Sequence, residues 1–198
     1  MSAPTVHASV VVIDEAGVLI RGASGAGKTT LALALVREAA RDGRFARLVA
    51  DDRTRLTAVN GRLVAEAPEA IAGLAEVRGL GVVAETCCPA AVVRLVVDLG
   101  AAGPRSPGGA ELRTAVEGIA LPRLQVAGNG SGGLVLACQT VFRVLSHAGC
   151  GGSALAFAPQ HEKLPLPAPS APLFRSIRDG PPRDDLDPER KQDCAETA

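Results

Sequence analysis

Aromatic residues are scarce in this chain of 198 residues, which contains no tryptophan, no tyrosine and four phenylalanines. Valine, leucine, isoleucine and alanine must therefore fill its core. Proteins that bind single-stranded nucleic acid stack the bases on aromatic side chains, and this chain offers few. An excess of positive or negative charge is absent too, because Lys plus Arg and Asp plus Glu both total 21. Without a basic surface to attract a polyanion, we expect no nucleic-acid partner.

Cysteines at metal-binding spacing are also missing. The five cysteines are odd in number and none belongs to a C-x-x-C pair: Cys87, Cys88, Cys138, Cys150 and Cys194. This pattern argues against a disulfide framework and against a zinc site. The adjacent Cys87 and Cys88 could form a redox or metal pair, but partly buried thiols that pack as small apolar residues are the simpler interpretation. We expect reduced thiols and a cytoplasmic protein.

Long hydrophobic runs are the third absence. Residues 90–99 form the longest apolar stretch, and Arg94 and Asp98 interrupt it. The first residues lack the basic segment and apolar run that mark a signal peptide. The sequence therefore predicts neither an export signal nor a membrane span, and no membrane partner.

The clearest motif that is present is a glycine-rich octet between an apolar segment, residues 18–21, and an Ala/Leu-rich segment, residues 30–36. It matches G-x-x-x-x-G-K-[ST] and consists of Gly22, Ala23, Ser24, Gly25, Ala26, Gly27, Lys28 and Thr29. In such a loop, backbone N–H groups and a helix N-terminus surround a phosphate, the lysine contacts the terminal phosphates and the hydroxyl holds Mg²⁺. A merely flexible loop before a helix is the alternative, but a strand before the octet and a helix after it favour nucleotide binding.

Two carboxylates follow the next apolar segment. Residues 47–50 are typical of a buried strand, and Asp51 and Asp52 come directly after it. Ligands of open α/β sheets bind at the carboxyl ends of strands, so this pattern resembles a Walker B element. A strand that ends in a solvated turn is the alternative. Either aspartate is available as a base for phosphoryl transfer, and both can face the nucleotide only if the strand ends there.

The remaining patterns predict an α/β fold. We expect strands at residues 6–13 and 18–21, a helix at 29–41 that lies flat on a sheet, a hairpin at 55–59 and 62–67 around Asn60-Gly61, and a short helix within 68–74. Residues 76–83 indicate a glycine-hinged loop, 91–99 a strand, 111–126 one or two strands, and 134–145 a helix that ends near Gly149. Together they predict a P-loop NTPase-like mixed sheet with an N-terminal hairpin, a helix after the P-loop and a C-terminal helix.

The chain resembles the catalytic domain of the bacterial HPr kinase/phosphorylase family over roughly residues 6–145. The resemblance rests on His7, the hairpin, the octet, residues 48–52 and above all the segment Glu-Val-Arg-Gly-Leu-Gly-Val at residues 76–82. Within this segment Arg78 and the two glycines would shape a signature loop, although an ordinary glycine turn with a surface arginine has the same composition. The family uses ATP to phosphorylate a serine of HPr, the small carrier of the sugar phosphotransferase system, and thereby regulates carbohydrate metabolism. It also removes that phosphate by phosphorolysis, which consumes inorganic phosphate and forms pyrophosphate.

The resemblance also implies roles for individual residues. Asp51 would be the base for the serine hydroxyl in the forward direction and the acid in reverse. Asp52 would lie close to the metal, and Glu76 would hold Mg²⁺ together with Thr29. His7 would support the active site near Asp51. The cofactors implied are ATP and Mg²⁺, and a homo-hexamer is the assembly that the family forms.

Three departures from long members of the family shape these expectations. About twenty residues precede the P-loop, so we expect a short form without the separate N-terminal domain and its control. Members of the family have a further catalytic arginine later in their sequence. Arg105 is its best counterpart in this chain and Arg113 is the second, and an ordinary loop arginine is the alternative interpretation. Residues 126–131, at the place of a segment linked to dephosphorylation, contain no basic residue. Kinase activity is therefore better supported than phosphorylase activity.

The resemblance assigns residues 1–150 to one catalytic domain. Residues 151–198 hold many prolines and charges and lose the helical and strand patterns, so we predict a disordered tail. Two other functions fit a P-loop domain of this size: a small-molecule kinase, or a catalytically weak module that binds ATP and signals by contact.

Overall fold

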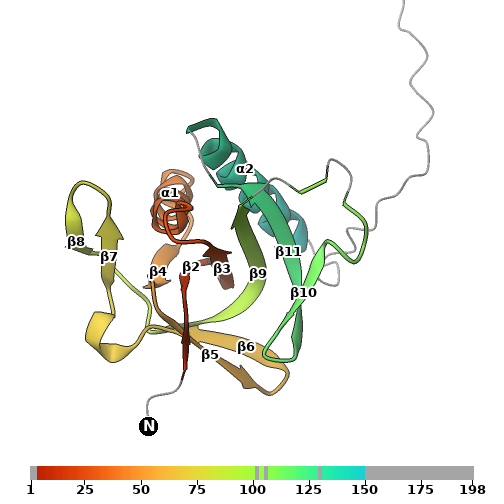
Figure 1. Cartoon of the computed structure of the whole chain (residues 1–198), viewed down its shortest axis with the longest axis horizontal. Coiled ribbons are helices and arrows are strands. Elements are labelled where there is room, and N and C mark those ends of the chain that lie inside the picture. The colour runs from red at the N-terminus through yellow and green to blue at the C-terminus, as the bar shows by residue number, and fades with distance from the viewer. Residues whose placement is uncertain (1–3, 101–102, 105–106, 129–130, 150–198) are drawn as a thin grey trace, which may run out of the picture. The chain divides into compact units, whose positions relative to one another are not determined.

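A computed structural model of the chain describes residues 4–100, 103–104, 107–128 and 131–149 (Figure 1). The predicted tail and Arg105 lie outside the described residues. The described strands are β1 (Thr5–Val6), β2 (Ala8–Ile13), β3 (Ala16–Gly22), β4 (Ala46–Ala50), β5 (Thr54–Val59), β6 (Arg62–Glu66), β7 (Leu74–Val77), β8 (Gly81–Ala84), β9 (Ala90–Gly100), β10 (Arg113–Val116) and β11 (Ile119–Ala127). The described helices are α1 (Lys28–Arg41), the 3₁₀ turn η1 (Glu69–Ile71) and α2 (Ser131–Gly149).

The main sheet is mixed, as the sequence predicts. Its strand order is β1-β5-β6-β9-β3-β2-β4, and β11 pairs with both β9 and β10. β3 runs parallel to β9, while β2 lies antiparallel between β3 and β4. β3 and β4 therefore run in the same direction. Their carboxyl ends, Gly22 and Ala50, consequently lie at one edge of the sheet.

The N-terminal hairpin forms the centre of this sheet because its strands are apolar on both faces. All six residues of β2 are buried, and Val18, Leu19 and Ile20 of β3 are completely buried. Val11 and Val18 belong to the core cluster that the helices cover, whereas Val10 and Leu19 belong to the cluster on the opposite face. The sheet thus separates two aliphatic cores, as expected for a chain with few aromatic residues.

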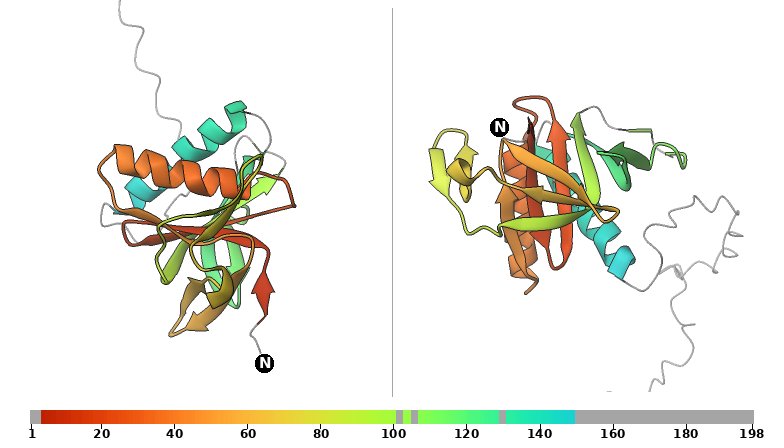
Figure 2. Two further views of the ribbon diagram at one scale, coloured as in Figure 1. Left: turned by 90° about the vertical axis from the view of Figure 1, so that its left-hand side faces the viewer. Right: turned by 90° about the horizontal axis from the view of Figure 1, so that it is seen from below.

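Helix α1 lies on one face of the sheet beside α2 (Figure 2). Leu31, Leu35 and Ala39 of α1 are fully buried and recur at helical spacing, so a single apolar stripe packs against β2, β3 and β4. Helix α2 packs on β11 and also contacts α1. The predicted helices after the P-loop and near the end of the domain are confirmed. None of the helices in the described part of the chain combines the length and apolar character needed to cross a bilayer.

Residues 74–84 correct one prediction. The segment expected to be a glycine-hinged loop is a β-hairpin, in which β7 pairs antiparallel with β8 as a separate two-stranded sheet. Gly79 and Gly81 have φ angles of 83° and 91°, in the left-handed region that favours glycine. Gly79 therefore lies in the turn of the hairpin and Gly81 begins β8, while the residues on either side alternate as strands. The helix predicted within 68–74 shortens to the three residues of η1.

Candidate active site

The P-loop connects the end of β3 to the start of α1, and its glycines are structurally required. A Cβ added at Gly22 would lie 2.7 Å from the carbonyl oxygen of Leu99 on the neighbouring strand. Gly25 and Gly27 have φ angles of 75° and 96°, which L side chains rarely adopt. No side chain caps the N-terminus of α1 at Gly27. Backbone N–H groups at this end of the helix are therefore available to an anion.

Lys28 is the first residue of α1, and its side chain folds back over the loop. Its Nζ donates to the carbonyl oxygens of Gly22 and Ala23, at 3.1 Å each. Lys28 is only 6% exposed. Burial lowers the pKa of its ammonium group below the usual value, and the nearby Asp52 and Asp51 carboxylates oppose this effect. The cation thus lies inside the loop that would surround a phosphate.

Asp51 is the most tightly held acid of the site. Its carboxylate is buried and accepts hydrogen bonds from the Ser9 hydroxyl at 2.5 Å and from the Glu76 backbone N–H at 3.1 Å. The Thr29 hydroxyl contacts both carboxylate oxygens, at 2.9 and 3.0 Å. These donors come from β2, α1 and β7, so Asp51 joins three elements that the chain brings together only on folding.

Asp52 turns away from Asp51 toward solvent. Its φ angle of 62° is left-handed, and its side chain is 56% exposed. Its Oδ1 lies 2.8 Å from Nε2 of His7, and its Oδ2 lies 3.8 Å from Nε of Arg53. The histidine expected near Asp51 thus contacts the neighbouring aspartate, because the left-handed turn carries Asp52 to His7 between β1 and β2.

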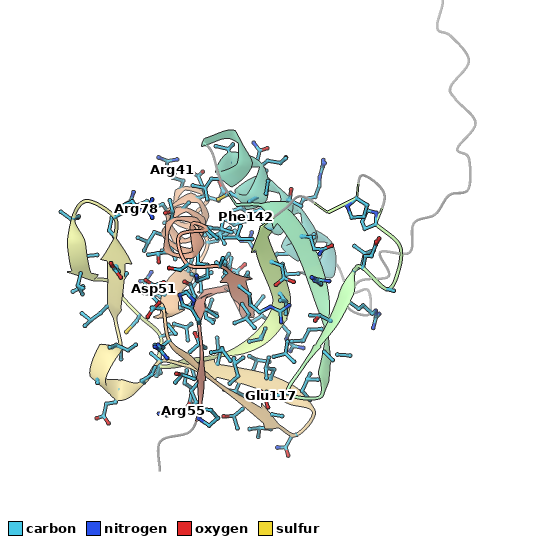
Figure 3. The ribbon with its side chains drawn as sticks, in the orientation of Figure 1. Arg41, Asp51, Arg55, Arg78, Glu117 and Phe142 are labelled. Atoms are coloured by element: carbon cyan, nitrogen blue, oxygen red, sulfur yellow. The ribbon has the colours of Figure 1, made fainter. Side chains whose placement is uncertain are left out.

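The P-loop, the two aspartates and the β7–β8 hairpin enclose one cleft of about 660 Å³. Glu76, Val77, Arg78, Gly79 and Gly81 of the hairpin line it, opposite Lys28 and Thr29. Figure 3 shows Asp51 and Arg78 on the side of the molecule that carries the hairpin. The Arg78 side chain lies against the P-loop. One of its guanidinium nitrogens is 3.4 Å from the position that a Cβ would occupy at Gly25. The cleft therefore collects Lys28 and Arg78 with three carboxylates.

The donor set at Thr29 suits Mg²⁺ better than a metal held by protein ligands alone. The described residues contain no group of three or more His, Cys, Asp or Glu side chains that could hold a metal ion. Mg²⁺ commonly uses one or two carboxylates together with substrate phosphates and water. The Thr29 hydroxyl and the Asp51 carboxylate, in direct contact beside the P-loop, fit that requirement. Glu76 and Asp52, the other predicted metal ligands, line the same cleft.

Two residues that contribute to the site were not recognised in the sequence. Ser9 is fully buried and donates to Asp51, and it is the only polar residue in the otherwise apolar strand β2. That isolation was a usable signal. Gly128, which follows β11, packs on the P-loop. A side chain would not fit there, because a Cβ at this position would lie 2.7 Å from the carbonyl oxygen of Ala26. It carries no comparable signal in the sequence.

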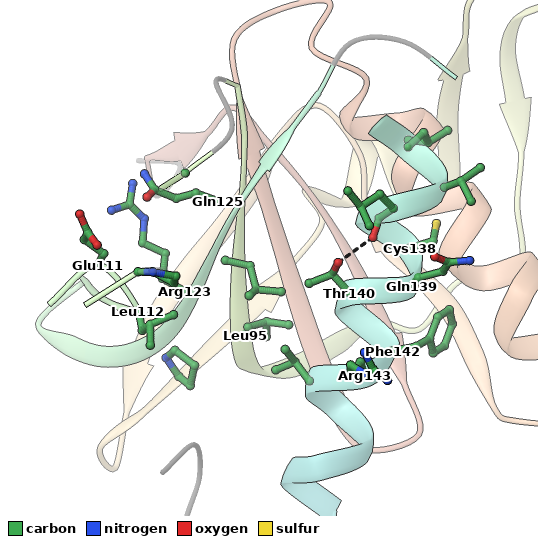
Figure 4. A pocket seen from close by; sticks show the side chains of 18 of the residues that line it. Leu95, Glu111, Leu112, Arg123, Gln125, Cys138, Gln139, Thr140, Phe142 and Arg143 are labelled. Carbon is green, nitrogen blue, oxygen red and sulfur yellow. Dashed lines mark hydrogen bonds between the residues drawn. The ribbon is translucent and has the colours of Figure 1, made fainter. Parts of the chain in front are cut away.

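A second cleft, of about 1410 Å³, lies between α2 and the β10–β11 region (Figure 4). Arg113, the second candidate for the later catalytic arginine, lines this cleft and not the one at the P-loop. Leu95, Leu112 and Phe142 are among its apolar residues. Apart from Arg113, none of the predicted site residues that the structure describes lines it.

An ion-pair network ties together the three parallel strands next to the P-loop. Arg21, directly before Gly22, donates to both carboxylate oxygens of Asp98 at 2.7 and 2.9 Å, and Arg123 donates to Asp98 at 2.6 Å. Burial alone would raise the pKa of Asp98. The hydrogen bonds and charges of both arginines outweigh burial, so its pKa lies below the usual value. This network links β3, β9 and β11 at the strand that leads into the loop.

Comparisons with known proteins agree with this geometry. Residues 1–88 match the family model of the HPr Serine kinase C-terminal domain. An HPr kinase/phosphorylase of Clostridium tetani is 39% identical over 77 residues, which are 39% of this chain and 23% of that protein. One of Geobacillus thermodenitrificans is 37% identical over 138 residues, which are 63% of this chain and 43% of that protein. The chain thus spans less than half the length of these relatives.

A solved structure extends the similarity to the fold. The HPr(Ser) kinase/phosphatase from Coxiella burnetii matches with a TM-score of 0.57 and 25% sequence identity, over 74% of this chain and 99% of that one. The match confirms the P-loop NTPase-like fold predicted from the sequence. By sequence and by fold, the chain is thus similar to the C-terminal domain of the HPr kinase/phosphorylase family.

Proposed function

We propose that this protein is an ATP-dependent serine kinase whose substrate is HPr or a related phosphocarrier of the sugar phosphotransferase system. One observation carries the proposal: Lys28, Thr29, Asp51 and Asp52 line a single cleft, where Thr29 contacts Asp51 and His7 pairs with Asp52 from outside the lining. Phosphoryl transfer requires a phosphate cradle, a metal site and a group that accepts the proton of the acceptor. The similarity to an HPr Serine kinase domain and to an HPr(Ser) kinase/phosphatase supports a serine of HPr as that acceptor.

The P-loop would bind the nucleotide phosphates. Lys28 and the N–H groups at the start of α1 stabilise negative charge on the phosphoryl group that is transferred. Thr29 and Asp51 would hold Mg²⁺, which supplies positive charge to the same phosphates when bound. Glu76, on the opposite wall of the cleft, is the further carboxylate that can contribute to the metal site.

The surroundings of the two aspartates support roles opposite to those expected from the resemblance. Both oxygens of Asp51 already accept hydrogen bonds, and its carboxylate is buried beside the P-loop threonine. Asp52 is more than half exposed and can be reached by an incoming serine. We therefore assign the metal site to Asp51 and the proton exchange to Asp52, with His7 as the residue that orients the Asp52 carboxylate.

The reverse reaction uses the same groups. Inorganic phosphate bound where the β-phosphate lies would attack the phosphorus of phosphoserine, so that the bond to the serine oxygen breaks and pyrophosphate forms. The serine oxygen then takes the proton that Asp52 carries. Residues 126–131 contain no basic residue to bind the incoming phosphate, so we place phosphorolysis second to the kinase reaction.

We further propose that one catalytic domain lies within residues 1–150, that residues 151–198 form a disordered tail, and that the protein is cytoplasmic and assembles as a homo-hexamer. The last proposal rests on the family resemblance and can be checked by light scattering.

The deciding experiment incubates the purified protein with Mg²⁺, labelled ATP and an HPr-type carrier, and then adds inorganic phosphate. Label on a serine of the carrier supports the kinase, and pyrophosphate with loss of that label supports phosphorolysis. Transfer only to a nucleotide or sugar would indicate a small-molecule kinase. ATP binding without any transfer would indicate a nucleotide-sensing module.

A further inference from the structure

The β7–β8 hairpin has two different faces. Leu74 pairs with Ala84, and Glu76 pairs with Val82, so these four side chains lie on one side of the two-stranded sheet. Ala75 and Val83 lie on the other side and pack into the core cluster around α1. Of the other described helices and strands, α1 is the one that packs substantially on the hairpin, and Figure 1 shows the hairpin standing apart from the main sheet.

The uncovered side is unusually apolar for a surface. Leu80 at the turn is 72% exposed and Val82 is 67% exposed, the largest values among the exposed large hydrophobic residues of the described chain. Leu74 adds 37%, and Ala84 is exposed beside it. We call the surface formed by Leu74, Leu80, Val82 and Ala84 the hairpin face. Contiguous exposed apolar residues of this kind commonly mark an interaction site.

The hairpin face is continuous with the phosphate-transfer cleft. Glu76, in the middle of that side of the hairpin, lines the cleft, and so do Arg78, Gly79 and Gly81 around the turn. Arg78 makes no hydrogen bond or ion pair within the described residues and is exposed. A molecule seated on the hairpin face would therefore also meet a free guanidinium and the mouth of the cleft.

Two other occupants fit this surface less well. A nucleobase would cover one or two of its residues, whereas a strand of four residues extends about 13 Å. A permanent interface with a second copy of the chain would bury Glu76 and block the mouth of the cleft, which the proposed function requires to be open. A transient partner that brings its own acceptor group satisfies both conditions.

We propose that the hairpin face docks the protein that carries the acceptor serine, through apolar side chains next to that serine. This inference rests on the proposed function and names the surface by which the kinase recognises a folded protein substrate. Arg78 would then face the substrate serine, or its phosphate, at the rim of the cleft.

The experiment compares the double variant Leu80→Gln/Val82→Thr with the control Val59→Thr/Leu136→Gln. The control makes the same two exchanges at exposed positions, 45% and 63% exposed, on β5 and α2. KM for an HPr-type carrier, kcat, ATP affinity and subunit number are measured for both, with Val82→Thr alone as a milder form. Loss of two apolar contacts should raise KM for the carrier about tenfold or more. The control should match the unaltered protein, and ATP affinity, kcat and subunit number should not change.

Other results would overturn the inference. An unchanged KM for the carrier would show that the hairpin face does not touch it. Weaker ATP binding would assign the face to the nucleobase, and a change in subunit number would assign it to a second copy. If the unaltered protein transfers nothing to the carrier, the proposed function fails, and carrier binding measured by fluorescence anisotropy then tests docking separately. If the double variant loses carrier binding while the control and the unaltered protein keep it, the docking surface is still supported. If the unaltered protein does not bind the carrier, the docking surface is refuted.

Discussion

The hydroxyl of Thr29 lies 2.9 and 3.0 Å from the two carboxylate oxygens of Asp51. Twenty-two residues separate them in the sequence, and the contact forms because β3 and β4 end at the same edge of the sheet. It brings the hydroxyl of the P-loop together with the acid of the neighbouring strand. The remaining groups of the site are arranged around this pair.

Exchange of either aspartate for asparagine should give different defects. Asp52→Asn should slow transfer to the carrier by about 10²–10⁴-fold with little change in ATP affinity, because it removes the exposed proton acceptor. Asp51→Asn should weaken the dependence of ATP binding on Mg²⁺, because it removes a metal ligand. Single-turnover rates and Mg²⁺ titrations separate the two effects. If Asp51→Asn abolishes transfer but leaves the Mg²⁺ dependence of ATP binding normal, Asp51 is instead the base for the serine hydroxyl, as the family resemblance implies.

Lys28→Ala should abolish tight ATP binding. A charge-assisted hydrogen bond contributes about 1.5–3 kcal/mol, so the dissociation constant should rise roughly 10- to 150-fold. Arg41→Ala provides the control, because Arg41 is an exposed cation in the last turn of the same helix. Binding is measured by calorimetry. Equal ATP affinity in the two variants would show that the P-loop is not the nucleotide site.

Ser9→Ala should affect both stability and the metal site. Removal of the buried hydroxyl leaves Asp51 without one of its donors, at an expected cost of about 1–3 kcal/mol in the free energy of unfolding. Thr54→Val is a matched control, because the Thr54 hydroxyl is equally buried but donates to the carbonyl oxygen of Ala8 at 2.8 Å. Both variants should unfold at lower temperature. Only Ser9→Ala should also change the Mg²⁺ concentration needed for ATP binding, and an equal shift in the control would make Ser9 purely structural.

Local patterns explain why much of the fold could be predicted. The P-loop glycines, the apolar stripe of α1 and the Asn60-Gly61 turn each depend on neighbouring residues. Asn60 and Gly61 indeed have φ angles of 49° and 72°, as a tight hairpin turn requires. The β7–β8 hairpin was missed because its apolar residues do not alternate with polar ones. Leu74 and Val82 are apolar although their side of the hairpin is exposed, so the sequence lacks the pattern that identifies a half-buried strand.

Long-range contacts explain why the site was predicted only in part. The sequence places both aspartates at the end of a strand, but their separation depends on the left-handed backbone of Asp52. Ser9 reaches Asp51 across 42 residues, and His7 reaches Asp52 from the start of the same hairpin. Such pairings depend on sheet register, and β2 and β4 change register between Val10 and Val11. No local pattern in the sequence encodes that shift.

Asp98→Asn should destabilise the protein in a way that depends on pH. The two arginines hold the pKa of Asp98 below its ordinary value of 3.8, so the folded state favours the charged carboxylate. The stabilisation is therefore fully present above the unfolded pKa and is lost as pH falls through the lower pKa of the folded state. The difference in unfolding free energy between the unaltered protein and Asp98→Asn should be constant near pH 7 and shrink in strong acid. Urea titrations at several pH values measure it, with Glu15→Gln in the exposed β2–β3 turn as the control. A difference that stays constant down to strong acid would show that the carboxylate charge of Asp98 does not stabilise the strands that lead into the P-loop.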